Sequence, residues 1–233
     1  MLPKLDIPIY ETILPVSQQK IEYRPMLVKE EKIVLLATES KDDKTIQKAV
    51  EQVLTNCIVN KVNPNDLPLA DVEYLLIQIR DKSLGGIQES EYICNENGCD
   101  ARFKLTYNFT EMKIDRSDNE KPNKIQLSKT VGIKLKPPSY GVLKDILSPE
   151  PYDYKVLADV VEVVYDDKQV YKLTESSAEE IEAFFDSFPK KKIEELYAYI
   201  DSMPKYTIKK EHVCKKCGHK HEIVIQDLAN LFT

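Results

Sequence analysis

The sequence has no run of apolar residues long enough to cross a bilayer, which takes about 20 consecutive residues. Its longest runs, Ile33 to Ala37 and Tyr74 to Ile77, are broken by charges well before that length. The first residues, Met1 to Asp6, also lack the charged leader and apolar core of a secretory signal peptide. We therefore expect a protein without a membrane span that stays in a cytoplasm, where its thiols remain reduced.

The sequence also lacks the short motifs of common nucleotide-binding and hydrolytic sites. It contains no P-loop, no G-x-G-x-x-G turn, no H-E-x-x-H helix and no G-x-S-x-G elbow. Only three histidines are present, all beside one cysteine pair, and the many acidic residues are scattered over expected helix surfaces. These absences argue against an enzyme.

The sequence also has no excess of basic over acidic residues. Lys and Arg number 33 against 39 Asp and Glu, which gives a net charge of -6. Non-specific binding of nucleic acid depends on neutralisation of phosphates by Lys and Arg. The negative net charge therefore argues against a non-specific nucleic-acid-binding protein. One local basic patch surrounds the second cysteine pair, but Glu211 and Glu222 interrupt it, and a solvated surface is the simpler interpretation. Its members are Lys205, Lys209, Lys210, Lys215, Lys216 and Lys220.

The chemistry that is present lies in the cysteines, of which there are five. Four of them form two close pairs, and each pair lies at a turn between two strand-like segments. Two such turns can present four thiolates to one tetrahedral ion, and a reducing compartment favours metal binding over disulfides. The sequence therefore predicts one structural Zn²⁺ site with the ligands Cys94, Cys99, Cys214 and Cys217. Four sulfur ligands leave no open position for catalysis.

Other readings of these residues remain open. The two pairs could be independent, one of them a redox dithiol, although the thioredoxin-like context of such motifs is missing. One of the histidines could replace a cysteine or donate a hydrogen bond to a thiolate, but exposed strand positions are the simpler interpretation. The histidines concerned are His212, His219 and His221. Cys57 falls on the apolar face of an expected helix and is interpreted as a core residue.

The periodicity of the apolar residues predicts an α+β fold: a helical core with β-hairpins and a discontinuous zinc-ribbon-like module made from two distant hairpins. We expect three regions: an N-terminal hairpin plus helices over 1–86, the zinc-ribbon module over 87–114 and 205–233, and a charged loop, short strands and amphipathic helices over 115–204. Helices are predicted near 28–38, 46–57, 67–84, 140–147, 154–161, 176–188 and 193–203.

Several local expectations are specific enough to test. Residues 125–136 alternate like one strand, and Asp166-Asp167 is expected to turn a short hairpin. Ser176 with Glu179 is typical of a capping box at the start of a helix. The expected buried stripe of that helix is Ile181, Phe184, Phe185 and Phe188. Residues 115–124 are charged and are interpreted as an exposed loop.

Three segments of the chain resemble the small baseplate hub proteins of T-even-like contractile-tailed bacteriophages. The segments run from Pro15 to Ala37, from Asp66 to Gly85 and from Met203 through the second cysteine pair to Phe232. The resemblance is strongest from Tyr23 to Lys32 and from Asp71 to Arg80. It carries over no catalytic residues.

The resemblance implies a non-enzymatic role in the tail baseplate hub, as a structural subunit or as an assembly factor. The implied partners are other hub and tail proteins, with the tape measure protein among the candidates. The implied locations are the host cytoplasm during assembly and the virion tail baseplate. The competing hypothesis is a zinc-ribbon factor that binds nucleic acid or acts in transcription.

Overall fold

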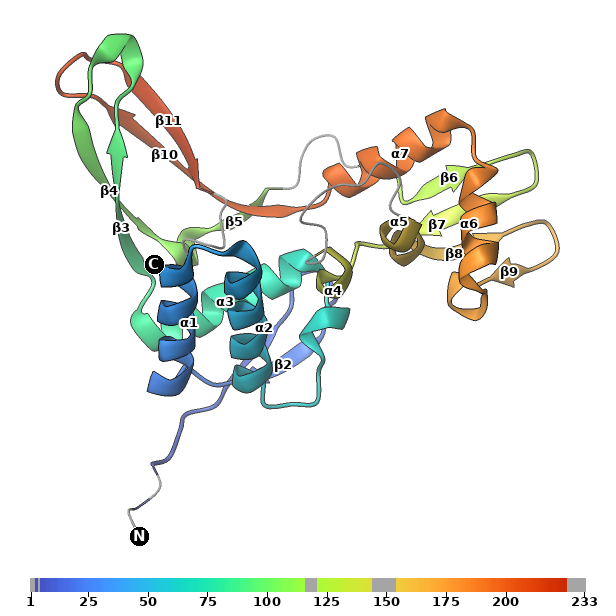
Figure 1. Ribbon diagram of the computed structural model, residues 1–233, viewed down its shortest axis with the longest axis horizontal. Helices are drawn as coiled ribbons and strands as arrows, with labels where there is room; N and C mark the ends of the chain where they lie inside the picture. Colours follow the sequence, from blue (N-terminus) through green and yellow to red (C-terminus); the bar gives the residue numbers. More distant parts are fainter. Residues whose placement is uncertain (1–2, 4, 116–120, 144–153, 226–233) are drawn as a thin grey trace. The chain divides into compact units, whose positions relative to one another are not determined.

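The computed structural model describes residues 3, 5–115, 121–143 and 154–225, and the chain divides into two compact units (Figure 1). The first unit is formed by residues 1–62, 70–115 and 205–233, and the second by residues 63–69 and 116–204. Helices and small antiparallel sheets are mixed along the chain, which confirms the expected α+β class. None of the helices in the described ranges has the length and apolar character needed to span a bilayer.

The first unit has a helical core. The carboxylate of Asp42 accepts a hydrogen bond from the backbone N–H of Thr45 at 2.9 Å and so begins the second helix. Cys57, at the end of that helix, is completely buried, and burial raises the pKa of its thiol to about 11. Its prediction as a core residue is confirmed. The helices are α1 (Val28–Ser40), α2 (Asp43–Cys57) and α3 (Leu69–Leu84).

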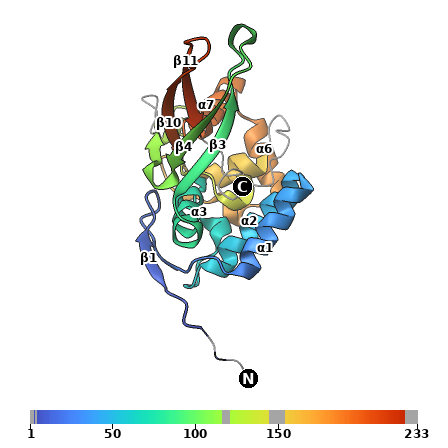
Figure 2. The same ribbon diagram turned by 90° about the vertical axis from the view of Figure 1, so that its left-hand side faces the viewer.

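The predicted N-terminal hairpin is present as β1 (Tyr10–Ile13) and β2 (Lys20–Tyr23). Its turn is held by Asp71 of α3, whose carboxylate oxygens accept the backbone N–H groups of Val16 and Ser17 at 2.8 Å each. Because the Asp71 side chain is fully buried, these two hydrogen bonds fix the hairpin against α3. Figure 2 shows residues 5–9, ahead of β1, leading away from the helices of this unit.

A second buried carboxyl on α3 makes stability depend on pH. Glu73 is 9% exposed, and burial raises its pKa to about 7 against the opposing effect of the Tyr206 backbone N–H. The folded state therefore holds the Glu73 proton more tightly than the unfolded state does, so the stabilisation is complete below the ordinary carboxyl pKa and is lost as pH rises toward 7.

We expect the free energy of unfolding to fall by about 2–3 kcal/mol between pH 4.5 and pH 8 through this group alone. Glu73→Gln should remove this part of the pH dependence and stabilise the protein at pH 8, as measured by urea unfolding at each pH. Glu39→Gln on the exposed surface of α1 is the matched control and should leave the profile unchanged. A Glu73→Gln profile with the wild-type slope would contradict the assignment.

Two long hairpins complete the first unit (Figure 1). One pairs β3 (Ile87–Ile93) with β4 (Arg102–Asn108), and the other pairs β10 (Lys205–Val213) with β11 (Lys220–Ile225). The short strand β5 (Lys113–Asp115) pairs with residues 205–207 of β10. This ladder brings the chain that follows the first hairpin against the base of the second, although about 100 residues separate them in sequence.

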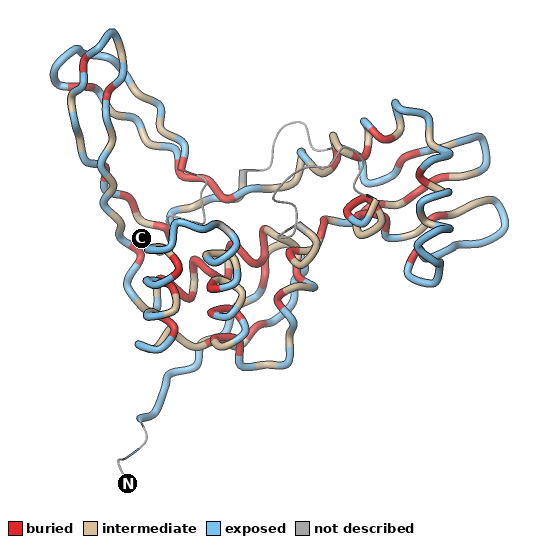
Figure 3. The backbone as a smooth tube through the Cα atoms, in the orientation of Figure 1, coloured by how far each residue is buried: buried red, intermediate tan, exposed pale blue. Residues whose placement is uncertain are grey.

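The second unit packs helices on an antiparallel sheet whose strand order is β6-β7-β8-β9. Phe185, Leu196 and Ile133 are among its most buried side chains, and Figure 3 shows buried positions along the sheet and the facing helices. Its strands are β6 (Lys124–Gln126), β7 (Gly132–Leu135), β8 (Val161–Tyr165) and β9 (Val170–Tyr171), and its helices α4 (Tyr140–Leu143), α5 (Tyr154–Val160), α6 (Ala178–Asp186) and α7 (Lys190–Asp201). Short 3-10 helices lie in both units: at Glu96–Gly98 and Phe109–Glu111 in the first, and at Pro64–Asp66 and Leu173–Glu175 in the second.

Three local predictions are corrected here. The stretch 125–136 is two strands rather than one, because residues 128–130 turn and the Leu127 N–H bonds the carbonyl of Val131. The capping box uses Ser177 and Glu180 instead of Ser176 and Glu179, one residue later. In the predicted stripe of α6 only Phe185 is fully buried, whereas Ile181, Phe184 and Phe188 pack against the core from its edge.

Other predictions are met or lie outside the described residues. Asp166 turns the β8–β9 hairpin by accepting the N–H groups of Lys168 and Gln169. The core of the expected loop, 116–120, and the end of the expected helix 140–147 lie outside the described residues, as does the end of the third resembling segment.

Candidate metal centre

The first cysteine pair is held by a tight turn that follows β3. The N–H of Cys94 donates to the carbonyl of Ala101 at 2.8 Å, and the N–H of Asp100 donates back to the carbonyl of Cys94 at 3.0 Å. Within the turn Gly98 has a φ of +72°, which a glycine adopts without steric cost. The turn therefore presents both sulfurs on one side of the hairpin tip.

The second pair repeats this construction between β10 and β11. The N–H of Cys214 donates to the carbonyl of His219 at 2.8 Å, and the N–H of Gly218 donates to the carbonyl of Cys214 at 2.9 Å. Gly218 has a φ of +74° and takes the place that Asp100, with a φ of +54°, has in the first turn, because each follows the second cysteine of its pair and donates its N–H to the carbonyl of the first. The two hairpin tips are thus equivalent sulfur-presenting turns, called knuckles below.

The four sulfurs lie together although they come from distant parts of the chain. All four Sγ atoms are within 4.8 Å of one another, with Cys94 Sγ 3.6 Å from Cys217 Sγ and Cys99 Sγ 3.7 Å from Cys214 Sγ. A tetrahedral ion with metal–sulfur bonds of about 2.3 Å has sulfur–sulfur edges of about 3.8 Å. The donor set therefore fits a four-coordinate thiophilic metal ion with little adjustment.

Burial and the backbone N–H groups of the knuckles shift the pKa values of these thiols in opposite directions. Burial raises the pKa of Cys94 to about 12 against the opposing Glu96 N–H, whereas the N–H groups of Cys217 and Lys216 lower the pKa of Cys214 to about 6. Without a metal, the Cys94 thiol thus keeps its proton at neutral pH. Because a bound metal must displace that proton, metal affinity is expected to weaken as pH falls.

Side chains from one knuckle also reach the other. The Lys216 ammonium donates to the backbone carbonyl of Cys99 at 2.6 Å, and His221 Nε2 lies 3.2 Å from Cys94 Sγ. His212 and His221 are half-buried, so their interpretation as exposed strand positions is wrong; His219 is exposed and lies 3.5 Å from Glu96.

The sequence pattern leaves the role of His221 undecided, and it predicts no contact between Lys216 and the other knuckle. A signal for His221 was available: alternate residues of a strand share one face, and Ile223 and Ile225 put His221 on the apolar face of β11. For Lys216 we find no such signal, because it occupies a turn whose neighbours only the tertiary structure defines.

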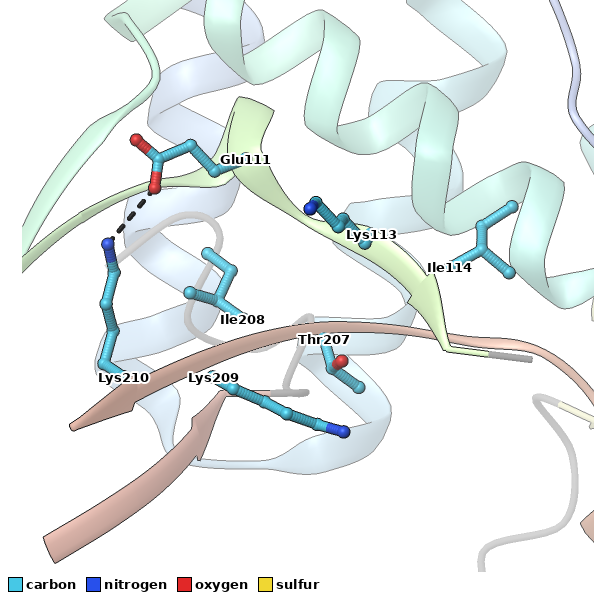
Figure 4. Close-up of a pocket in the computed structure, with 7 residues that line it drawn as sticks. All are labelled: Glu111, Lys113, Ile114, Thr207, Ile208, Lys209 and Lys210. Carbon is cyan, nitrogen blue, oxygen red and sulfur yellow. Dashed lines mark hydrogen bonds and ion pairs between the residues drawn. The ribbon is translucent and has the colours of Figure 1, made fainter. Parts of the chain in front are cut away.

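The first unit also contains a cavity of about 600 Å³ beside β5 and β10 (Figure 4). Among the described residues that line it, Glu111 supplies the one carboxylate, and the Lys210 ammonium holds it at 3.1 Å. The rest of this lining is basic, aliphatic or hydroxylic. The Glu111 carboxylate is thus engaged in an ion pair with Lys210.

A model of the protein family described as T4 bacteriophage base plate protein matches residues 7–233. The match includes both knuckles and both units. No curated protein and no solved structure matches the chain.

Proposed function

The chain belongs to the T4 bacteriophage base plate protein family, and we propose that it acts in the baseplate hub, as a structural subunit or as an assembly factor in baseplate and tail morphogenesis. Membership of this family ties the chain to the phage baseplate, with other baseplate and tail proteins as its partners. The match over nearly the whole chain supports the baseplate role, and the resemblance of the segments at both ends to baseplate hub proteins carries the hub proposal. Neither the family nor the cavity supplies a reason to expect catalysis.

We further propose that Cys94, Cys99, Cys214 and Cys217 hold one structural Zn²⁺ in a closed four-sulfur shell. Zinc is favoured because thiolate donors in a tetrahedral arrangement match its usual structural sites. The bound ion would tie the two knuckles together and so make folding of the first unit depend on metal. Metal analysis of the purified protein is expected to find about one zinc per chain.

One candidate contact element is the segment that leads into β1, residues 5–9, which we call the arm. Leu5, Ile7 and Ile9 alternate along it and are 87%, 38% and 57% exposed. Ile13, which shares the outward side of β1 with Glu11, is 61% exposed. The arm itself is in neither a helix nor a strand. An extended segment with alternate apolar side chains is suited to binding along the edge of a partner's sheet.

Replacing Leu5, Ile7 and Ile9 together with alanine is expected to lower the yield of complete baseplates at least tenfold, because burying each aliphatic side chain contributes about 1.5–3 kcal/mol. The measurement is the number of intact tails from phage that carry the triple substitution. Asp6→Ala with Pro8→Ala on the same arm is the matched control. The purified triple variant should unfold within about 0.5 kcal/mol of wild type, because these side chains are exposed. A normal yield of tails from the triple variant would show that the arm makes no contact needed for baseplate assembly.

Two experiments on whole particles test the hub proposal. Cross-linking mass spectrometry of purified tails should link this chain to central hub proteins, and the tape measure protein is the candidate to examine among them. The copy number per particle then separates a retained subunit from an assembly factor that leaves. Cross-links confined to the baseplate periphery would contradict the hub assignment.

The competing hypothesis of a nucleic-acid-binding factor rests on the lysines of the second knuckle. Lys215 and Lys220 are exposed there, but Lys216 is engaged with the carbonyl of Cys99. Gel-shift titration with duplex DNA and with single-stranded RNA at 50 mM and 200 mM salt tests this reading. Salt-sensitive binding at micromolar protein would favour it over the baseplate role of the knuckles.

A further inference from the structure

We propose that His221 is a positioning residue of the metal centre, whose Nε2–H donates a hydrogen bond to the Cys94 thiolate. This inference rests on the proposed zinc site. The Nε2–Sγ distance is 3.2 Å, which is short for a hydrogen bond to sulfur. His221 lies on the second hairpin and Cys94 on the first, so this contact joins the two knuckles, as the contact of Lys216 with Cys99 does.

The His221 ring is held in place by aromatic neighbours from both hairpins. The Phe103 ring of β4 lies 5.4 Å from it between centroids, and the His219 ring meets it edge-on at 4.7 Å. Phe103 is itself stacked on His212, the cross-strand partner of His221, with a centroid distance of 3.9 Å. Because these contacts restrict the ring, the hydrogen bond to sulfur costs little conformational entropy.

When zinc is bound, the negative charge of the site makes a hydrogen bond to sulfur stabilising. Four thiolates around one Zn²⁺ leave an excess of negative charge on the sulfurs, and hydrogen-bond donors spread that charge. Cys94 Sγ cannot obtain such donors from water, because its residue is completely buried. The side chain of His221 therefore complements the knuckle N–H groups at the sulfur that solvent cannot reach.

This arrangement makes the four ligands unequal. Cys94, Cys99 and Cys214 are buried, whereas Cys217 is exposed. Attack by a chelator or an alkylating reagent is expected to begin at Cys217 and to reach Cys94 last. Removing His221 should narrow this difference, because Cys94 then loses a donor and gains reactivity.

The test uses the full-length, zinc-loaded protein and its His221→Ala and His212→Gln variants. Zinc release to excess EDTA should be about tenfold or more faster in His221→Ala, and Cys94 should be alkylated earlier by iodoacetamide, as peptide mass spectrometry reports. In the cobalt-substituted protein the thiolate-to-cobalt charge-transfer band should shift. His212→Gln removes an aromatic ring from the same cluster but no sulfur contact, so it should keep the wild-type band and alkylation order.

A measurement on the wild type alone covers the case in which His221→Ala does not fold. Long-range ¹H–¹⁵N NMR of the zinc-loaded protein should show His221 protonated at Nε2. An unprotonated Nε2, or equal effects of the two variants, would overturn the inference and leave the zinc site standing. A folded wild-type protein without bound zinc would instead overturn the proposed site, and this inference with it.

Discussion

Cys94→Ala and Cys214→Ala are each expected to abolish binding of the proposed zinc ion, although the two residues are more than a hundred positions apart in sequence. A shell that loses one of four ligands from either knuckle no longer encloses the ion. We expect each variant to lose at least about 4 kcal/mol of stability, the contribution of a ligand present at a thousand times its Kd. Elemental analysis and thermal unfolding in the presence of zinc measure the two effects.

Cys57→Ala is the matched control for these variants. It removes a buried thiol that lies outside the sulfur cluster, so it should keep the full zinc content and show only a packing loss of about 1 kcal/mol. Loss of zinc in one knuckle variant but not in the other would show that the two pairs do not share one ion. EDTA should reproduce the loss of stability in wild type and leave both knuckle variants unaffected.

Glu30→Ala is expected to destabilise the protein by about 3–5 kcal/mol, the usual cost of removing one partner of a buried ion pair. The Glu30 side chain is 0% exposed, and one of its oxygens lies 2.9 Å from the Arg24 guanidinium. The carboxylate also accepts the backbone N–H of Leu27 at 2.9 Å, which caps α1. Chemical denaturation at pH 7 measures the loss.

The pH dependence of this pair has the opposite sign to that of Glu73. Burial opposes the charge, but the hydrogen bonds from Arg24 and Leu27 hold the pKa of Glu30 below its ordinary value. The stabilisation from Glu30 is therefore complete above the ordinary carboxyl pKa and is lost as pH falls through the lowered one.

Glu31→Ala, at the next position of α1, is the control and should change stability by no more than about 0.5 kcal/mol. Combining Arg24→Met with Glu30→Leu should recover much of the loss, because no buried charge then remains without a partner. A loss below about 1 kcal/mol in Glu30→Ala would contradict the assigned role of the pair.

The resembling segment Tyr23 to Lys32 contains this pair, but no local pattern in that segment predicts the ion pair. Arg24 and Glu30 are six residues apart on either side of a helix start, and side-chain pairing rules for helices do not cover that arrangement. The contact forms because the Glu30 carboxylate, in the first turn of α1, reaches back to the Leu27 N–H and to the Arg24 guanidinium. Only the folded backbone shows that the guanidinium lies at that point.

The capping box of α6 shows how precisely the local sequence can predict where a helix starts. Ser176 and Ser177 are each followed three residues later by a glutamate, so the local pattern fits two helix starts equally well. Burial of Phe185 in the core of the second unit fixes the rotation of the helix and selects Ser177. Local sequence could place the helix to within one residue, and packing decided the rest.

The sequence by itself determined the helices of the first unit, its hairpins and the position of both cysteine pairs at hairpin tips. Those features depend on periodicity, capping and glycine turns, which act over a few residues. The sequence also predicted that the two cysteine pairs share one site, and the folded chain brings the four sulfurs together. The tertiary structure decided that β5 pairs with β10 and that His221 and Lys216 reach across to the opposite knuckle. These contacts join residues about a hundred positions apart, and their geometry depends on how the whole unit packs rather than on any local pattern.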